Sequence, residues 1–143
     1  MKYQKSSHAT YDVRYHVVWI TKYRNPFITE EIKERLDFLI RHISKKLWVI
    51  IIKLWFEEDH VHMYCRIPLT KPISTTIWYI KWSISRRIKK DFYNEIKKWY
   101  WKIWEIWATW YFVASVWEIN WDIVWKYVEN QWKEENYSEE IEL

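Results

Sequence analysis

The chain opens with an alternation of apolar and polar side chains that is typical of a β-strand buried on one face. Between Tyr11 and Thr21 the apolar set comprises Val13, Tyr15, Val17 and Trp19, and the polar set comprises Asp12, Arg14 and His16. Because successive side chains of a strand point to opposite faces, the polar set should face solvent. Asn25 and Pro26 then interrupt regular structure, so the first strand is expected to end before them.

Two later segments have the spacing of amphipathic helices. Thr29 is a suitable N-cap, and Glu30 and Glu31 would complement the positive end of the first helix. Its apolar positions are Ile32, Leu36, Leu39, Ile40, Ile43 and Leu47. After Pro72, a second helix is predicted from Ile73, Ile77, Ile80, Ile84 and Ile88. The spacing of these residues places them along one buried face, and basic residues crowd the remaining surface.

Three more strands and a final helix complete the pattern. The β-branched run Val49 to Leu54 and the stretch His60 to Arg66 read as a hairpin that ends before Pro68. Tyr111 to Val116 reads as a fourth strand, and Asp122 to Lys133 as a last helix. Residues 93–110 follow no single period and are expected to form an irregular connection.

The order of these elements predicts an α+β fold of the ferredoxin-like βαββαβ type. Its four-stranded antiparallel sheet would carry two helices on one face and leave the other face open, with the C-terminal helix added. On the third strand, Val61, Met63 and Cys65 would face the helices. His60, His62, Tyr64 and Arg66 would then face the open side. We expect one domain over residues 1–133 and an acidic tail over residues 134–143.

The charge distribution favours a polyanionic partner. The last ten residues carry five acidic residues and no basic one, so residues 1–133 hold 23 basic and 14 acidic residues, a net charge of +9. A solvated surface with a solubilising tail explains the same numbers equally well. No apolar run approaches the roughly 18 to 20 residues of a membrane span, and no signal-peptide core follows the first residues. With its single cysteine, Cys65, the chain is expected to be a cytoplasmic protein without a membrane partner.

The absence of glycine is abnormal. Usual composition predicts about ten glycines in a chain of this length, but there are none, and tryptophan occurs 14 times. Trp48 follows the first helix where a left-handed cap is usual, and Trp121 lies in a turn where glycine would be usual. Our hypothesis is that many of these positions are glycine in the natural parent, replaced by design or through an error in the recorded sequence. An intact mass that matches this sequence would show that the tryptophans exist and rule out the second explanation.

Two short motifs could carry chemistry. His60 and His62 share one strand face, and two imidazoles there make half of a metal site, although paired surface histidines are also common. Tyr127 and Gln131 lie four residues apart and share a helix face. A phenol can act as a nucleophile, and an amide oxygen suits Mg²⁺ or Mn²⁺. The alternative is an interfacial tyrosine beside an incidental glutamine.

Together these motifs resemble a known family. His60-Val61-His62 has the His-hydrophobic-His form of the HUH nucleases. The chain is similar, from about residue 8 to residue 132, to the single-tyrosine HUH transposases (TnpA type) of small prokaryotic insertion sequences. The segments that carry this resemblance are Tyr15 to Arg24, Glu58 to His62, Tyr111 to Val113 and Tyr127 to Gln131.

The resemblance implies a reaction and its residues. His60, His62 and Gln131 would bind a divalent metal, Mg²⁺ or Mn²⁺, and Tyr127 would attack DNA to leave a 5′-phosphotyrosine link and a free 3′-OH. Members of this family are homodimers that bind single-stranded DNA hairpins at element ends. The residues that we expect to contact DNA are Arg14, His16, Lys22, Tyr23, Arg24, Lys81, Arg86, Arg87, Lys89 and Lys90.

Two alternative functions stay open at this point. One is a domesticated relative that cleaves repeat hairpins by the same chemistry, and the other is a non-catalytic module that binds single-stranded nucleic acid. The chain also departs from the family, because Trp55, Trp117 and Trp121 stand where small residues are usual. If the tyrosine helix swings on a hinge, glycine at positions 117 and 121 should raise strand-transfer rates.

Overall fold

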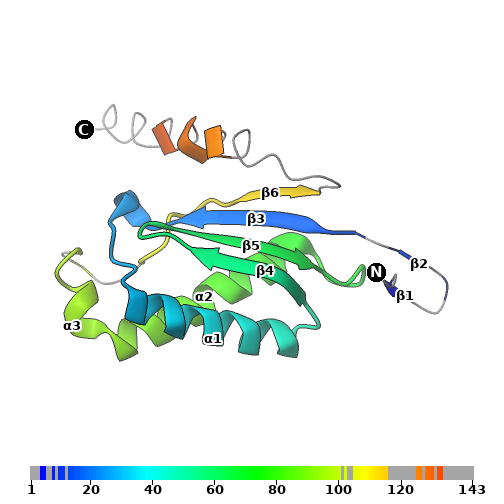
Figure 1. Cartoon of the computed structure of the whole chain (residues 1–143), viewed down its shortest axis with the longest axis horizontal. Helices are drawn as coiled ribbons and strands as arrows, with labels where there is room; N and C mark the ends of the chain where they lie inside the picture. The colour runs from blue at the N-terminus through cyan, green and yellow to red at the C-terminus, as the bar shows by residue number, and fades with distance from the viewer. Residues whose placement is uncertain are drawn as a thin grey trace.

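The architecture is described from a computed structural model of the whole chain (Figure 1). The structure describes residues 4–5, 8, 10–11, 13–100, 102, 105–115, 125–126, 128–130 and 132–133. Every structural statement below refers to these residues. Within them, no helix combines the length and the apolar character that crossing a membrane requires.

The main sheet has the strand order β4-β5-β3-β6, with every neighbouring pair antiparallel. Its strands are β3 (Tyr15–Ile20), β4 (Ile50–Phe56), β5 (His60–Arg66) and β6 (Phe112–Ser115). This confirms the predicted ferredoxin-like arrangement. The first strand begins later than expected, because β1 (Gln4–Lys5) and β2 (Thr10–Tyr11) form a separate two-stranded sheet.

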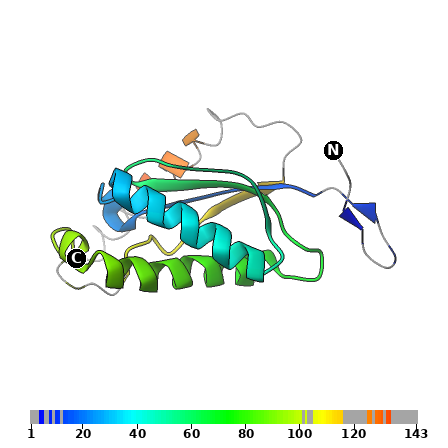
Figure 2. The same cartoon turned by 60° about the horizontal axis from the view of Figure 1, so that its bottom comes forward.

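Two helices cover one face of the sheet, as Figures 1 and 2 show. In α1 (Glu30–Lys46) the Thr29 hydroxyl accepts a hydrogen bond from the Ile32 amide at 3.3 Å, which confirms the predicted cap. The buried faces of α1 and α2 (Ile73–Asp91) carry the isoleucines and leucines expected from the spacing. They pack on Val17, Trp19, Val61, Met63 and Cys65 in one core.

The segment between α2 and β6 is largely irregular, as predicted, but contains the short helix α3 (Tyr93–Ile96). The turn after β3 forms a short 3-10 segment, η1 (Lys22–Arg24). Tyr23 and Arg24 have φ values of 60° and 52°, so both lie in the left-handed region that residues with a Cβ rarely occupy.

The opposite face of the sheet is covered, and the prediction of an open face is wrong. Val18 and Ile20 are fully buried there against Val128, with Trp125 and Trp132 packed on the same cluster. The described residues near the C-terminus are helical at 125–126, 128–130 and 132–133, consistent with the predicted last helix, and lie over this face (Figure 1). The second face is covered because β3 carries apolar side chains on both of its faces. Burying the apolar area of each face stabilises the fold.

Candidate active site

The two histidines of β5 lie together on the sheet face opposite the helices. His60 pairs with Ile20 and His62 with Val18 across the β3–β5 ladder. Their ring centroids are 4.8 Å apart, and each residue is only 7% exposed. This confirms that both face away from α1 and α2, but they lie beneath other side chains rather than in open solvent.

The Asp59 carboxylate is hydrogen-bonded to one ring nitrogen of His60. Its Nδ1 lies 2.6 Å from Oδ1 of Asp59, and the other carboxylate oxygen accepts a hydrogen bond from Arg24 Nε at 2.9 Å. Burial alone would raise the pKa of Asp59, but the His60 hydrogen bond and the Arg24 charge outweigh it and hold that pKa below its ordinary value. The carboxylate is therefore ionised at neutral pH.

The His16 ring is in hydrogen-bond contact with His62. His16 pairs with Tyr64 in the ladder and is the diagonal neighbour of His62, and its Nε2 lies 3.3 Å from His62 Nδ1. The rings are stacked with centroids 5.5 Å apart and planes 12° apart. Burial lowers the pKa of His16 to about 4, and burial with the nearby histidine charges lowers the pKa of His62 to about 3. Both rings are thus neutral near pH 7, which is the form of imidazole that binds metals.

These residues fit part of a divalent metal site. Metal-binding histidines commonly use one ring nitrogen for the ion and the other for a hydrogen bond to the protein, and His60 and His62 both have such a partner at Nδ1. Among the described residues, no group of three His, Cys, Asp or Glu side chains could hold a metal ion. A complete metal site would therefore need a further ligand, either of another residue type or from outside the described residues. The predicted nucleophile Tyr127 and third ligand Gln131 lie outside the described residues, as do Trp117 and Trp121.

Two indoles lie directly against the imidazoles. Trp55 is opposite His62 in the β4–β5 ladder, and the two rings stack with centroids 4.6 Å apart. Trp125 lies with its ring centroid 4.4 Å from that of His60, and the Arg24 guanidinium is 5.3 Å from the Trp125 ring centroid. Sequence reasoning singled out Trp55 but missed Trp125, whose position depends on how the C-terminal residues pack.

The basic residues predicted to contact DNA are divided between several environments. His16 is 0% exposed, so its expected place on a solvent-facing surface is wrong.

Other predicted contact residues already have partners within the chain. Arg14 donates to the Tyr64 hydroxyl at 3.4 Å, and Lys22 forms an ion pair with Glu105 at 3.3 Å. Arg24 forms an ion pair with Asp59, whereas the Tyr23 side chain is exposed to solvent. Arg86, Arg87 and Lys90 are exposed on α2, and Lys89 is half-buried.

Lys81 is the clearest departure from the predicted basic surface. It is only 8% exposed, and its Nζ donates to the carbonyl oxygens of Ala108, Thr109 and Trp110 at 2.8, 3.4 and 3.2 Å. The helical period could not reveal this, because the carbonyls belong to a distant irregular segment. Lys81 therefore anchors the chain before β6 and is not a free surface charge.

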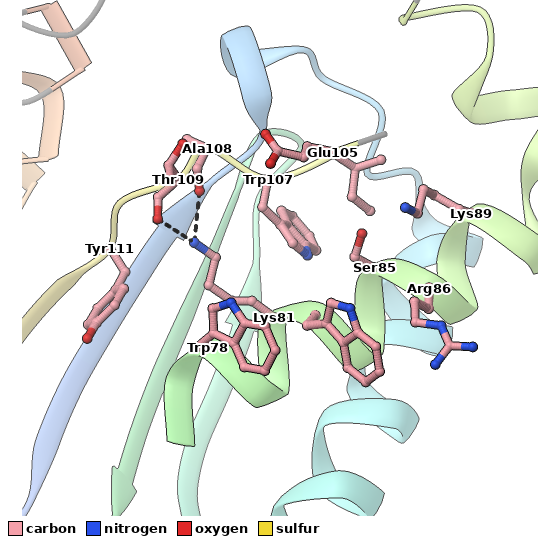
Figure 3. Close-up of a pocket in the computed structure, with 12 residues that line it drawn as sticks. Trp78, Lys81, Ser85, Arg86, Lys89, Glu105, Trp107, Ala108, Thr109 and Tyr111 are labelled. Carbon is pink, nitrogen blue, oxygen red and sulfur yellow. Dashed lines mark hydrogen bonds between the residues drawn. The ribbon is translucent and has the colours of Figure 1, made fainter. Parts of the chain in front are cut away.

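A cavity of about 320 Å³ lies beside this anchor, between α2 and residues 105–111 (Figure 3). Trp78 and Trp82 line it with stacked rings 5.8 Å apart, and the Arg86 guanidinium lies 4.8 Å from the Trp82 ring centroid. This mixture of aromatic and cationic groups is typical of surfaces that bind single-stranded nucleic acid. It lies on the helix-covered side of the sheet, away from the histidine pair.

Asp59 is the functional candidate that sequence reasoning did not assign. Its signal was present, since an acidic residue immediately precedes the His60-Val61-His62 motif. The contact itself depends on the β4–β5 turn, where Asp59 lies beside Arg24 of η1. A hollow of about 600 Å³ adjoins this corner and is lined by Arg24, Lys33, Glu58, Asp59 and His60.

The fold and the site together define an α+β domain of ferredoxin-like topology that carries paired imidazoles on the sheet face opposite its two helices. The family described as "Transposase IS200 like" matches residues 9–131. The chain belongs to this family of transposases.

Individual relatives agree with this assignment. The ISDra2 transposase TnpA of Deinococcus radiodurans is 25% identical over 133 residues, which is 92% of both chains. The transposase for insertion sequence element IS200 of Salmonella typhimurium is 25% identical over 137 residues, 96% of this chain and 88% of that one.

Solved structures share the fold. A crystal structure of a transposase from Deinococcus radiodurans superimposes with a TM-score of 0.81 at 26% identity, covering 90% of this chain and 97% of that one. A REP-associated tyrosine transposase bound to a REP hairpin gives a TM-score of 0.53 at 13% identity, covering 90% of this chain and 68% of that one. The second likeness shows the fold alone.

Proposed function

We propose that this protein is a metal-dependent transposase that cleaves and rejoins single-stranded DNA at hairpin-marked element ends. The observation that carries the proposal is the pair His60 and His62, each in a hydrogen-bond contact through Nδ1, on the sheet of an IS200-like transposase fold. A binding module would gain nothing from two histidines arranged in this way.

The proposed reaction uses four residues. His60 and His62, with Gln131 as third ligand, would hold Mg²⁺ or Mn²⁺. When bound, the ion would polarise the phosphate and stabilise the charge that develops there. The Tyr127 hydroxyl loses its proton and attacks phosphorus, so a phosphotyrosine bond forms, the bond from phosphorus to the 3′ oxygen breaks, and that oxygen takes up a proton. A free 3′-OH later attacks the phosphotyrosine and releases Tyr127, which rejoins strands without external energy.

DNA would contact the protein on two sides of the sheet. Arg86, Arg87, Lys89 and Lys90 belong to α2, whereas the histidine pair faces the other way. The stem of a hairpin could lie along the basic residues of α2 while the cleaved strand passes an edge of the sheet to the histidines. We also infer a homodimer of cytoplasmic location, in which residues 1–133 form the domain and residues 134–143 an acidic tail.

Adduct formation tests this function. Labelled single-stranded hairpin DNA is incubated with the protein and Mg²⁺ or Mn²⁺, and covalent complexes that survive denaturation are counted. We expect an adduct with the unmodified chain and none with Tyr127→Phe, His60→Ala or His62→Ala. Matched controls are Tyr93→Phe and His42→Ala, which remove exposed residues of the same types on the helices and should retain the adduct.

The outcomes separate the alternatives. An adduct that persists in Tyr127→Phe contradicts the assigned nucleophile. Hairpin binding without any adduct indicates a non-catalytic binding module. Cleavage of repeat hairpins without strand joining indicates a domesticated nuclease.

A further inference from the structure

We propose that Asp59 and His16 are positioning residues of this site. Each fixes the tautomer of one metal-binding histidine, so that His60 and His62 both carry a proton on Nδ1 and present Nε2 to the ion. This inference rests on the proposed function, because it assumes that the pair binds a divalent metal.

For His60, the hydrogen-bond pattern favours a proton on Nδ1. The Asp59 carboxylate already accepts from Arg24 Nε through one oxygen and lies 2.6 Å from His60 Nδ1 through the other, so we assign the proton in that contact to the ring, with the nitrogen donating and the carboxylate accepting. A ring that carries its single proton on Nδ1 has its lone pair on Nε2, where the ion would bind. Arg24 occupies the other carboxylate oxygen at 2.9 Å and keeps Asp59 charged and oriented. One Asp59 oxygen thus serves the ring and the other serves the guanidinium.

The backbone supports this arrangement at a local cost. Arg24 has a φ of 52° and follows Tyr23, which has a φ of 60°. Left-handed conformations are unfavourable for residues with a Cβ, and such strain is concentrated at functional sites. Here the strained turn holds the Arg24 guanidinium against Asp59. The same guanidinium also lies over the Trp125 ring.

For His62, the partner is a buried imidazole ring. His16 is fully buried, and its Nε2 is 3.3 Å from His62 Nδ1. One of the two nitrogens must donate and the other accept. If His62 is to bind the ion through Nε2, its proton lies on Nδ1 and is donated to Nε2 of His16, which in turn carries its own proton on Nδ1.

The tautomers can be measured directly. Long-range ¹H–¹⁵N NMR of the full chain, ¹⁵N-labelled at histidine and free of metal, should show His60 and His62 protonated on Nδ1. Asp59→Ala should convert His60 to a mixture of tautomers, and His16→Leu should do so for His62. Asp59→Asn and His16→Gln keep an accepting oxygen and should retain much of the Nδ1–H form.

Binding of Mn²⁺ alone, followed by electron paramagnetic resonance, gives the second readout. We expect Asp59→Ala and His16→Leu each to weaken Mn²⁺ binding about 10- to 100-fold, the usual loss when the partner of a metal-binding histidine is removed. The conservative variants should lose less. Asp37→Ala removes an aspartate from a surface ion pair with Arg41 and should leave Mn²⁺ binding unchanged.

The possible failures are distinguishable. Protonation of either ring on Nε2 in the unmodified protein would overturn its assigned orientation. Unaltered Mn²⁺ affinity in folded Asp59→Ala and His16→Leu would overturn the positioning roles alone and leave the transposase assignment intact. An unmodified chain that binds no Mn²⁺ would overturn both this inference and the metal dependence of the proposed function.

Discussion

Trp48 has a φ of 60° at the end of α1 and is 76% exposed. The Val49 amide donates to the Ser44 carbonyl at 2.9 Å and the Trp48 amide to the Lys45 carbonyl at 3.3 Å, which is a Schellman motif. Glycine is the usual residue at this left-handed position, because it has no Cβ to clash. The geometry therefore supports the hypothesis that tryptophan occupies a glycine position here.

Replacing Trp48 by glycine should stabilise the fold. A residue with a Cβ is destabilised by roughly 1–2 kcal/mol in the left-handed conformation, and glycine avoids this penalty. Glycine also loses more conformational entropy on folding, which cancels part of the gain in stability. We expect Trp48→Gly to raise the free energy of unfolding by about 1 kcal/mol in a urea titration. Trp99→Gly is the matched control, since Trp99 is also exposed but is not a positive-φ residue. A gain of equal size in both variants would contradict the backbone explanation.

Cys65 should make stability fall at alkaline pH. Burial raises the pKa of its thiol from 9.0 to about 12. Between about pH 9 and pH 12 the unfolded chain loses this proton while the folded chain keeps it, so the free energy of unfolding decreases as the pH rises, by up to about 1.4 kcal/mol per pH unit. Cys65→Ala should show a shallower decrease over this window in pH-dependent denaturation. Parallel curves for the two proteins would show that the thiol contributes nothing.

At the scale of elements, the site depends on the register of the β3, β4 and β5 strands. Pairing of Val18 with His62 and of Trp55 with His62 places the His62 imidazole against both the His16 ring and the Trp55 indole. A register shift of one residue would exchange His62 with Val61 or Met63 across the sheet, because strand side chains alternate. The apolar face formed by Val61, Met63 and Cys65 against the helices resists such a shift.

The anchor between α2 and the chain before β6 is a second element-level feature. Lys81→Met keeps the aliphatic part of the side chain but removes the donor to the carbonyls of residues 108–110. We expect the free energy of unfolding to fall by about 2 kcal/mol, as when a charged hydrogen-bonding group is lost. Amide hydrogen exchange in β6 should also become faster. Lys90→Met, an exposed lysine of the same helix, should change neither quantity.

At the scale of the whole molecule, the sheet separates two surfaces. The histidine pair lies on the face covered by residues 125–133 where these are described, whereas the exposed cations of α2 lie on the other side. The proposed function therefore places DNA binding by α2 and the chemistry of the histidines on opposite faces of the sheet. Substitutions on the two surfaces should affect different quantities.

Salt dependence tests this separation. If Arg87 contacts one phosphate, Arg87→Ala should weaken hairpin binding and reduce the slope of log affinity against log salt by about one. His62→Ala should leave that slope unchanged while abolishing the covalent adduct. Fluorescence anisotropy with labelled hairpin at several salt concentrations measures both slopes. An unchanged slope in Arg87→Ala would remove this residue from the DNA surface.

Sequence patterns were sufficient for the four strands of the main sheet, for α1 and α2, and for the orientation of the histidines, but not for β1, β2 or α3. The isoleucines of α2 and the Thr29 cap follow from periodicity and local hydrogen bonding, both of which act over a few residues. Alternation placed His60 and His62 opposite the helix-covered face for the same reason. Even the left-handed conformation at Trp48 was predictable from its place after a helix.

Only the tertiary structure decided what surrounds these residues. Contacts such as Asp59 with Arg24, His16 with His62 and Lys81 with the carbonyls of residues 108–110 join segments that are 27 to 46 residues apart. No local period encodes such pairs, because they depend on register and on the packing of irregular segments. The sequence by itself determined that two imidazoles share one face of an antiparallel sheet. The folded chain decided that this face is buried and that Asp59 and His16 hold the imidazoles there.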